Sequence, residues 1–231
     1  MSPVEENRNA RRNAMILGVS PAAAALAQAL EDAGWNRPPA PEVVENDEEL
    51  SRPVRMGHAP LARLERGSCL QASVDLARRI AKLAVREPFV LEDPRLLLTL
   101  PAWRPLIGAD CAFLCVFEDP AQAASHVARL AGEVHYQGAL ARWTELYRGV
   151  LDCHAHAGDW LFVDACTLRD QVGRTPLAAF LGVAPSALDV VLHTHPALHE
   201  SIRPVPSATL RAFAELCGRA AAGALDRIPA A

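Results

Sequence analysis

The chain contains four short, almost continuous apolar runs, at residues 14–19 (AMILGV), 88–94 (PFVLEDP), 111–117 (CAFLCVF) and 159–165 (DWLFVDA). Runs of this length, without regular alternation of polar residues, are typical of strands that are buried on both faces. Helical patterns fill the intervals between them. Strands that alternate with helices in this way predict an α/β fold, in which helices cover both faces of a parallel sheet.

The predicted helices connect these strands. The first is expected at residues 21–34, with Ser20 as its N-cap and Pro21 at its first helical position. Another is expected to end at Gly182, because glycine favours the position that follows a helix. The sequence predicts these further helices: 59–86 (in two pieces, broken near Gly67), 95–103, 120–132, 136–157, 174–182 and 206–222.

The length of 231 residues is sufficient for one domain with a sizeable core. Residues 1–13 are polar and are predicted to form a disordered tail, so a single domain is expected to span residues 14–225. The formal net charge of −4 favours neither nucleic acid nor an anionic membrane as a partner. No run is long and apolar enough to cross a membrane, and Pro21 interrupts the stretch that a signal peptide would need. These features predict a cytoplasmic protein.

Two kinds of buried side chain are expected in the core. The six cysteines include no CxxC pair, which favours buried thiols in a reducing compartment. Cys111 and Cys115 lie four residues apart on a predicted strand and therefore share one face. Trp103 and Trp143 lie on predicted helices among apolar residues, so we expect them in the core rather than stacked on a ligand.

The candidate site lies at the carboxyl ends of the strands, where open parallel sheets bind their ligands. The predicted order places residues 18–22, 92–95, 118–120 and 165–169 there. The first of these segments joins a strand to a helix, as a phosphate-binding loop does. However, between Gly18 and the helix there is no second glycine, lysine, arginine or threonine.

The order of motifs along the chain resembles that of the bacterial sulfotransferase family. The opening ILGVSPAAAALAQAL takes the place of the family's ILGMHRSGTSALAxAL, and EDPRLLLTLPAW resembles KDPRLCLTLPFW. CAFLCVFEDPAQAASHVARL is similar to a strand followed by R-x-P-x-x-V-x-x-S-L, and ALARWTELYRGVLD to ALALWERYNRALL. WLFVDACTLRDQVGRTPLAAFLGV resembles xxVxYEDLLxDPxxxLxxLxxFLGL. The resemblance covers residues 14–222.

This resemblance implies a P-loop-like domain that binds 3′-phosphoadenosine-5′-phosphosulfate and transfers its sulfuryl group to a hydroxyl or an amine. Several of the family's ligands for the nucleotide are missing. Its Arg-Ser-Gly-Thr falls on residues 21–24, its KDPR lysine on Glu92, and its 3′-phosphate arginine on Glu118. The paired serine falls on His126, with Ser125 beside it. The positions that would still line the donor are Gly18, Val19, Ser20, Ala22, Arg95 and Ser125.

The missing contacts are large in energy. A hydrogen bond to a charged group is worth about 1.5–3 kcal/mol, so losing two or three cations and a threonine would remove ~5–8 kcal/mol of nucleotide binding. We therefore predict a sulfotransferase-like, non-catalytic protein with a degenerate nucleotide site and no cofactor. It is expected to bind an unknown protein partner or a small ligand through the inherited cleft, or to form a homo-oligomer.

Two alternatives stay open at this point. In the first, the protein is an active sulfotransferase that holds 3′-phosphoadenosine-5′-phosphosulfate with Arg95 and backbone N–H groups, and its general base is His58 or a glutamate of the acidic run at 45–49. The favoured interpretation of Arg95 is structural, as a partner of Asp93. In the second, histidines bind a metal. The histidine-rich segments match no HExxH or paired CxxC spacing, so no metal is predicted; they comprise Cys153, His154, His156, His193, His195 and His199.

Overall fold

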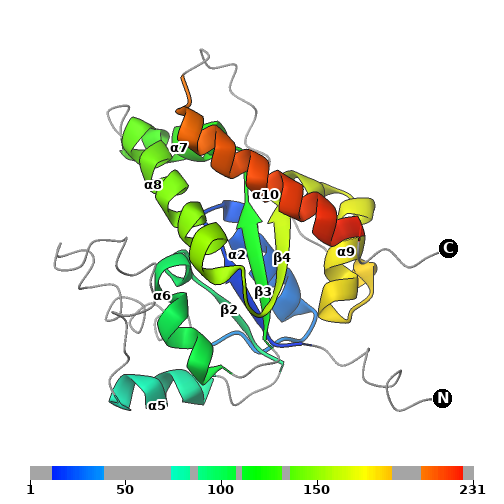
Figure 1. The fold of residues 1–231 in the computed structure, drawn as a ribbon. Coiled ribbons are helices and arrows are strands. Elements are labelled where there is room, and N and C mark those ends of the chain that lie inside the picture. The colour runs from blue at the N-terminus through cyan, green and yellow to red at the C-terminus, as the bar shows by residue number, and fades with distance from the viewer. Residues whose placement is uncertain are drawn as a thin grey trace.

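The computed structural model describes residues 12–38, 74–83, 88–107, 111–131, 136–188 and 204–225. Its centre is a sheet of four parallel strands in the order β2-β1-β3-β4 (Figure 1). The strands are β1 (Ala14–Leu17), β2 (Val90–Glu92), β3 (Ala112–Phe117) and β4 (Asp159–Asp164). Each lies inside one of the four apolar runs, so the predicted parallel α/β architecture is confirmed.

All strand pairs in the sheet are parallel, and the two inner strands are buried on both faces. β1 is one of the two inner strands, and its Met15 lies opposite Leu91 of β2 and Phe113 of β3. β3 continues the sheet and pairs along its whole length with β4, from Ala112 opposite Asp159 onward. β1 and β3 are buried at every position, because helices cover the side chains that point to either face.

The helices lie close to their predicted positions. The α-helices are α2 (Pro21–Asp32), α5 (Val74–Leu83), α6 (Leu96–Trp103), α7 (Pro120–Ala131), α8 (Tyr136–Gly149), α9 (Gln171–Leu181) and α10 (Ser207–Leu225). Shorter helical segments are η2 (Arg104–Leu106), the π-helical η4 (Val150–His154), η5 (Ala165–Arg169) and η6 (Pro185–Ala187). The helix predicted at 59–86 is described only over α5.

Local capping explains where two of these helices begin and end. The Ser20 hydroxyl accepts the Ala22 N–H at 3.2 Å, which confirms Ser20 as the N-cap of α2. Gly182 follows α9 with φ 71°, a left-handed conformation in which a Cβ atom is strained, and so it confirms the predicted helix end. The start of α9 was predicted three residues too late. Asp170 caps it, accepting the Gly173 N–H at 2.7 Å.

Two further helices differ from the prediction. The α-helical part of the segment predicted at 136–157 ends at Gly149, and a π-helical turn follows, in which the Ala155 N–H reaches the Val150 carbonyl at 2.9 Å. The helix predicted at 95–103 contains a proline, a residue that commonly ends a helix. Instead Pro101 lies inside α6, and the chain continues into η2 through Pro105.

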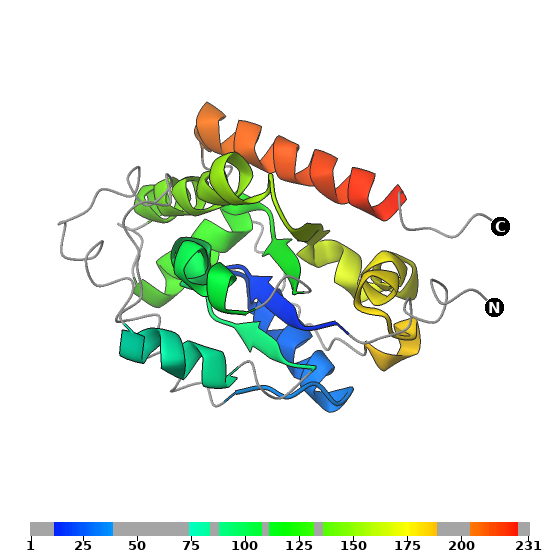
Figure 2. The ribbon, with the colours of Figure 1, turned by 60° about the horizontal axis from the view of Figure 1, so that its bottom comes forward.

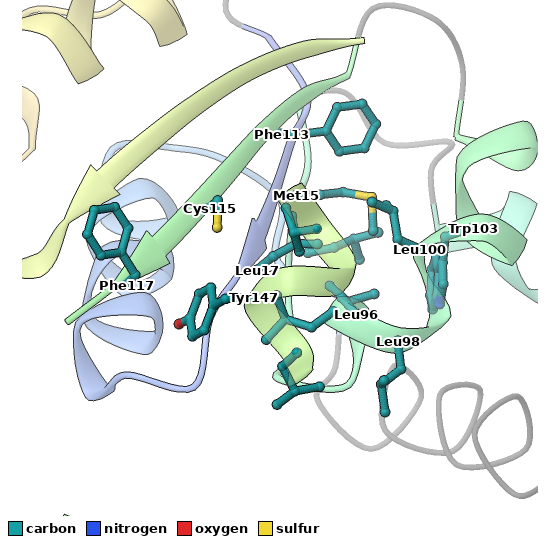
Figure 3. Packing of buried hydrophobic residues seen from close by; sticks show 14 of the residues in the cluster. Met15, Leu17, Leu96, Leu98, Leu100, Trp103, Phe113, Cys115, Phe117 and Tyr147 are labelled. Atoms are coloured by element: carbon teal, nitrogen blue, oxygen red, sulfur yellow. The ribbon is translucent and has the colours of Figure 1, made fainter. Parts of the chain in front are cut away.

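The two faces of the sheet carry separate hydrophobic clusters. On one face, α6, α8 and α10 cover residues such as Met15, Leu17 and Phe117. Figure 3 shows these side chains beside Tyr147 of α8. On the other face, α2 and α9 cover residues such as Leu114. Figures 1 and 2 show the sheet between these two layers, with α10 crossing one side of it.

Of the side chains expected in the core, both tryptophans, Cys111 and Cys115 are buried. The prediction of buried thiols is wrong for Cys166, which is exposed, and for Cys217, which is only half-buried. Trp103 is 0% exposed and Trp143 is 2% exposed, and both belong to the α6/α8/α10 cluster. Cys111 and Cys115 are buried in the same cluster as free thiols. Burial raises the pKa of the Cys111 thiol to about 12 and that of Cys115 further still, so both thiols stay protonated at neutral pH. Within the described part of the chain, no helix has both the length and the apolar character needed to cross a membrane.

Candidate functional site

The carboxyl ends of β1 and β3 lie side by side at the switch point of the sheet. The chain runs from β1 to β2 on one side of this point and from β3 to β4 on the other. The strand order places β1 between β2 and β3, and α2 follows β1 directly on one face. β3 leads through α7 into α8, which packs on the opposite face. In open α/β sheets such a switch point is where ligands bind. The segments 18–22 and 118–120 were predicted at the carboxyl edge of the sheet, and they lie together at this switch point.

Gly18 lets the two strands approach each other closely. A Cβ atom built on Gly18 would lie 2.4 Å from the carbonyl oxygen of Val116, on the neighbouring strand β3. The sequence placed Gly18 in the segment that joins a strand to a helix. Among the described glycines, however, only Gly34, Gly158 and Gly182 have positive φ, so Gly18 is required for close packing and not for a left-handed turn.

The amide of the next residue is bound from inside the protein. Val19 donates its N–H to the Tyr147 hydroxyl at 3.3 Å, and that hydroxyl donates to the Val116 carbonyl at 2.8 Å. Tyr147 is fully buried, and burial raises its pKa well above 10. The phenol therefore stays protonated and joins α8 to the ends of β1 and β3. The amide that a phosphate-binding loop would present to its ligand has an internal acceptor instead.

The Ser20 side chain also has partners within the protein. Its oxygen caps α2 by accepting the Ala22 N–H, and the side chain lies near Glu118 at the end of β3. Burial is the main cause that raises the pKa of Glu118, and the nearby Asp119 and Asp164 raise it further, while the nearby Ser20 side chain lowers it. The position of the family's 3′-phosphate arginine is thus a half-buried carboxyl group, with Asp119 beside it after β3 and Asp164 at the end of β4.

The other two acids at this edge serve as caps. Asp119 accepts the N–H groups of Ala121 and Gln122 at 2.8 and 3.1 Å, at the start of α7. Asp164 accepts the Cys166 N–H at 3.0 Å, at the start of η5. Both carboxylates hold the first turn of the element that follows their own strand. Glu118 differs from them because the polar side chain that it lies near, Ser20, belongs to the loop after the neighbouring strand β1.

Methyl groups take the positions where the resemblance placed phosphate ligands. Ala22 is 4% exposed and Ala23 is 0% exposed, and both pack in the α2/α9 cluster under the sheet. Ser125 is half-buried on α7, in the second turn after its start at Pro120. The side chain of His126 lies outside the described residues. These alanines contribute to the core and offer no polar atom to a ligand.

At the end of β2, the predicted pair of Asp93 and Arg95 is present. Arg95 donates through Nε and Nη2 to the two carboxylate oxygens of Asp93, at 2.8 and 2.7 Å, and the Arg95 N–H reaches the same group at 2.8 Å. The Asp93 side chain is only 5% exposed. Beside it, Arg37 pairs with Glu92 at 3.2 Å. Both arginines hold carboxylates at this strand end, which favours the structural role for Arg95.

Replacing Arg95 with methionine is expected to destabilise the fold by about 2–3 kcal/mol, because it leaves the buried Asp93 carboxylate without its bidentate partner. Arg78→Met provides the matched control. Its partner Asp75 and Arg78 itself are 83% and 73% exposed, so we expect a change within about 0.5 kcal/mol. Urea unfolding measures both variants, and equal effects would contradict the structural role of the Arg95 pair.

Other predicted functional residues lie apart from this edge or outside the described residues. The second group comprises the acidic run at 45–49, His58, His193, His195 and His199, and the side chains of Cys153 and His154. His156 is exposed and contacts the Asp152 carbonyl through Nε2 at 3.1 Å. Over the described ranges, no three His, Cys, Asp or Glu side chains are grouped as metal ligands would be.

One important residue, Tyr147, was missed by the sequence reasoning. Its spacing of four residues from Trp143 places both rings on one helix face, and in the structure the rings are 4.5 Å apart. That pattern predicts burial of the ring. It carries no signal that the hydroxyl binds a loop 128 residues away in the sequence.

Comparisons with known proteins add no relative to this picture. No family model, curated protein or solved structure matches the chain. The evidence for a function therefore comes from the residues at the carboxyl edge of the sheet.

Proposed function

We propose that this protein is a non-catalytic, sulfotransferase-like binding protein, whose carboxyl edge engages a protein partner or a small ligand other than a nucleotide. The observation that supports it most strongly is the occupied loop after β1. The Val19 N–H donates to the buried Tyr147 hydroxyl, and the Ser20 side-chain oxygen accepts the Ala22 N–H of α2. A phosphate entering this loop would have to compete with both contacts.

Charge supports the same proposal. Glu118, Asp119 and Asp164 stand at the ends of neighbouring strands β3 and β4, close enough to raise the pKa of Glu118. Two like charges about 5 Å apart repel by about 3 kcal/mol at an effective dielectric constant of ~20. Anionic groups of a nucleotide would meet this repulsion, whereas a neutral or cationic group of a partner would not. The edge therefore favours a partner that presents such groups.

The decisive experiment is a thermal-shift titration with adenosine 3′,5′-bisphosphate. We expect no change in Tm up to about 1 mM ligand. A micromolar site would be saturated at that concentration, and at 100 times Kd it would add about 2.7 kcal/mol to the folded state, or roughly 5–10 °C in Tm. Such a rise would contradict the proposal and favour an active transferase, in which Arg95 leaves Asp93 to hold the donor.

A further inference from the structure

We propose that the indole N–H of Trp143 is the hydrogen-bond donor of a small-molecule site at the carboxyl edge of the sheet, and that its ligand is a neutral aromatic compound with a carbonyl or similar acceptor. The inference rests on the proposed function, because it names the class of small ligand that this edge takes. It is carried by one buried nitrogen atom, Nε1 of Trp143.

Trp143 carries a buried donor without an acceptor. Its side chain is 2% exposed, and among the described residues its Nε1 is the buried side-chain atom for which no hydrogen-bond partner is present. By contrast, the indoles of Trp35 and Trp160 donate to backbone carbonyls at 2.8 and 2.9 Å. Because native proteins pair nearly all buried polar groups, the unpaired indole N–H is a feature that a bound acceptor explains.

The position of this donor is at the carboxyl side of the sheet. α8 leads through η4 into β4, which starts beside the start of β3, so α8 ends toward the amino edge. Figure 1 shows α8 starting beyond the carboxyl end of β3 and running back along the sheet. Trp143 comes one turn before Tyr147, whose hydroxyl binds the Val19 N–H and the Val116 carbonyl at the strand ends. The indole therefore lies beside the switch point, where open α/β sheets bind ligands.

The surroundings of the indole select a ligand with an aromatic body. The Tyr147 ring lies 4.5 Å from the Trp143 ring, and the Phe213 ring of α10 meets it edge-on at 6.3 Å. Phe213 is half-buried and packs on the same cluster as the half-buried Val19. A ligand reaches Nε1 when the Phe213 ring turns aside. An aromatic ligand then replaces the edge-to-face contact that Phe213 gives up.

The charge of the ligand follows from the same edge. An indole N–H donates and cannot accept, so the ligand has to present an acceptor. Glu118 lies near enough to Tyr147 to contribute to the raised pKa of that phenol, and Asp119 and Asp164 stand beside Glu118. These acids repel an anionic acceptor such as a carboxylate or a phosphate. A neutral carbonyl compound satisfies the donor without meeting this repulsion.

The test is an NMR titration of the isotope-labelled wild-type protein with acetophenone, a neutral ring that carries one carbonyl acceptor. The indole N–H signals of Trp35 and Trp160 are internal controls, since both groups already donate to carbonyls. Trp143→Phe assigns the signal of Trp143. If that variant does not fold, nuclear Overhauser contacts to the Tyr147 and Phe213 rings assign it. Sodium benzoate, which has the same ring with a negative charge, tests the charge.

We expect acetophenone, added to about 10 mM, to move the Trp143 indole proton downfield along a saturable curve, as an affinity in the millimolar range would. The control indoles should stay in place, and benzoate should move none of them. Loss of the hydrogen bond in W143F is expected to weaken acetophenone binding about 2- to 12-fold, measured by thermal shift.

Four results would overturn the inference. They are a Trp143 signal that does not move, an equal shift of all indole signals, an equal response to benzoate, and a nuclear Overhauser contact to a long-lived water that persists in acetophenone. The last result would assign the donor to an internal water. Binding of adenosine 3′,5′-bisphosphate would contradict the proposed function, whereas an unresponsive Trp143 overturns this inference alone.

Discussion

Replacing Gly18 with alanine is expected to destabilise the protein by about 3 kcal/mol. The new Cβ would lie 2.4 Å from the carbonyl oxygen of Val116 and 3.3 Å from the Cβ of Ala23. The obstacle is the backbone of a central strand, which cannot rotate away as a flexible side chain can. β1 and β3 would have to separate at this point, at the upper end of the cost of overpacking a core. Urea unfolding should show a lower midpoint with an unchanged slope.

Gly218→Ala is the matched control for this effect. Gly218 lies inside α10, and a Cβ atom there would meet no other heavy atom within 4 Å. Alanine is the better helix former, so this variant is expected to gain about 0.5–1 kcal/mol. The two substitutions are chemically identical and differ only in the space around them. A G18A variant as stable as the wild type would show that the close approach of β1 to β3 does not limit this loop.

The fold could be predicted from local patterns because each strand is buried on both faces. The run CAFLCVF contains no charged residue that would mark an exposed face, and it forms β3 (Ala112–Phe117), which is buried at every position. Ser20 and Pro21 marked the start of α2 through chemistry within three residues. The start of α9 was less clear in the sequence, because Asp170 and the residues before the predicted start were not recognised as a cap and a first turn.

The candidate site was harder to predict because its contacts join distant segments. The sequence showed that Glu118 follows a strand and that Ser20 precedes a helix, but not that the two side chains lie near each other. It placed Gly18 in a segment that joins a strand to a helix, whereas the reason for glycine is the Val116 carbonyl on another strand. Such contacts depend on strand order, and local periodicity carries no information about which strands are neighbours.

Replacing Tyr147 with phenylalanine is expected to destabilise the protein by about 2–4 kcal/mol. The ring would keep its packing against Trp143 at 4.5 Å, so the change isolates the hydroxyl. Two backbone groups would lose this partner, the N–H of the half-buried Val19 and the buried carbonyl of Val116. Each buried polar group left unsatisfied costs roughly 1–3 kcal/mol. Amide hydrogen exchange should place the loss at Val19, whose N–H would exchange faster than in the wild type.

The dependence of this loss on pH separates the hydroxyl from the ring. Because burial raises the Tyr147 pKa well above 10, the folded state binds the phenol proton more tightly than the unfolded state does. The stabilisation is thus complete below the unfolded pKa of about 10 and falls as pH rises beyond it. The difference in unfolding free energy between wild type and Y147F should stay constant from about pH 7 to 9 and narrow above about pH 10. A free-energy difference that does not change with pH would assign the loss to packing of the ring. The Val19 amide would then be free to bind a ligand, which would contradict the proposed function.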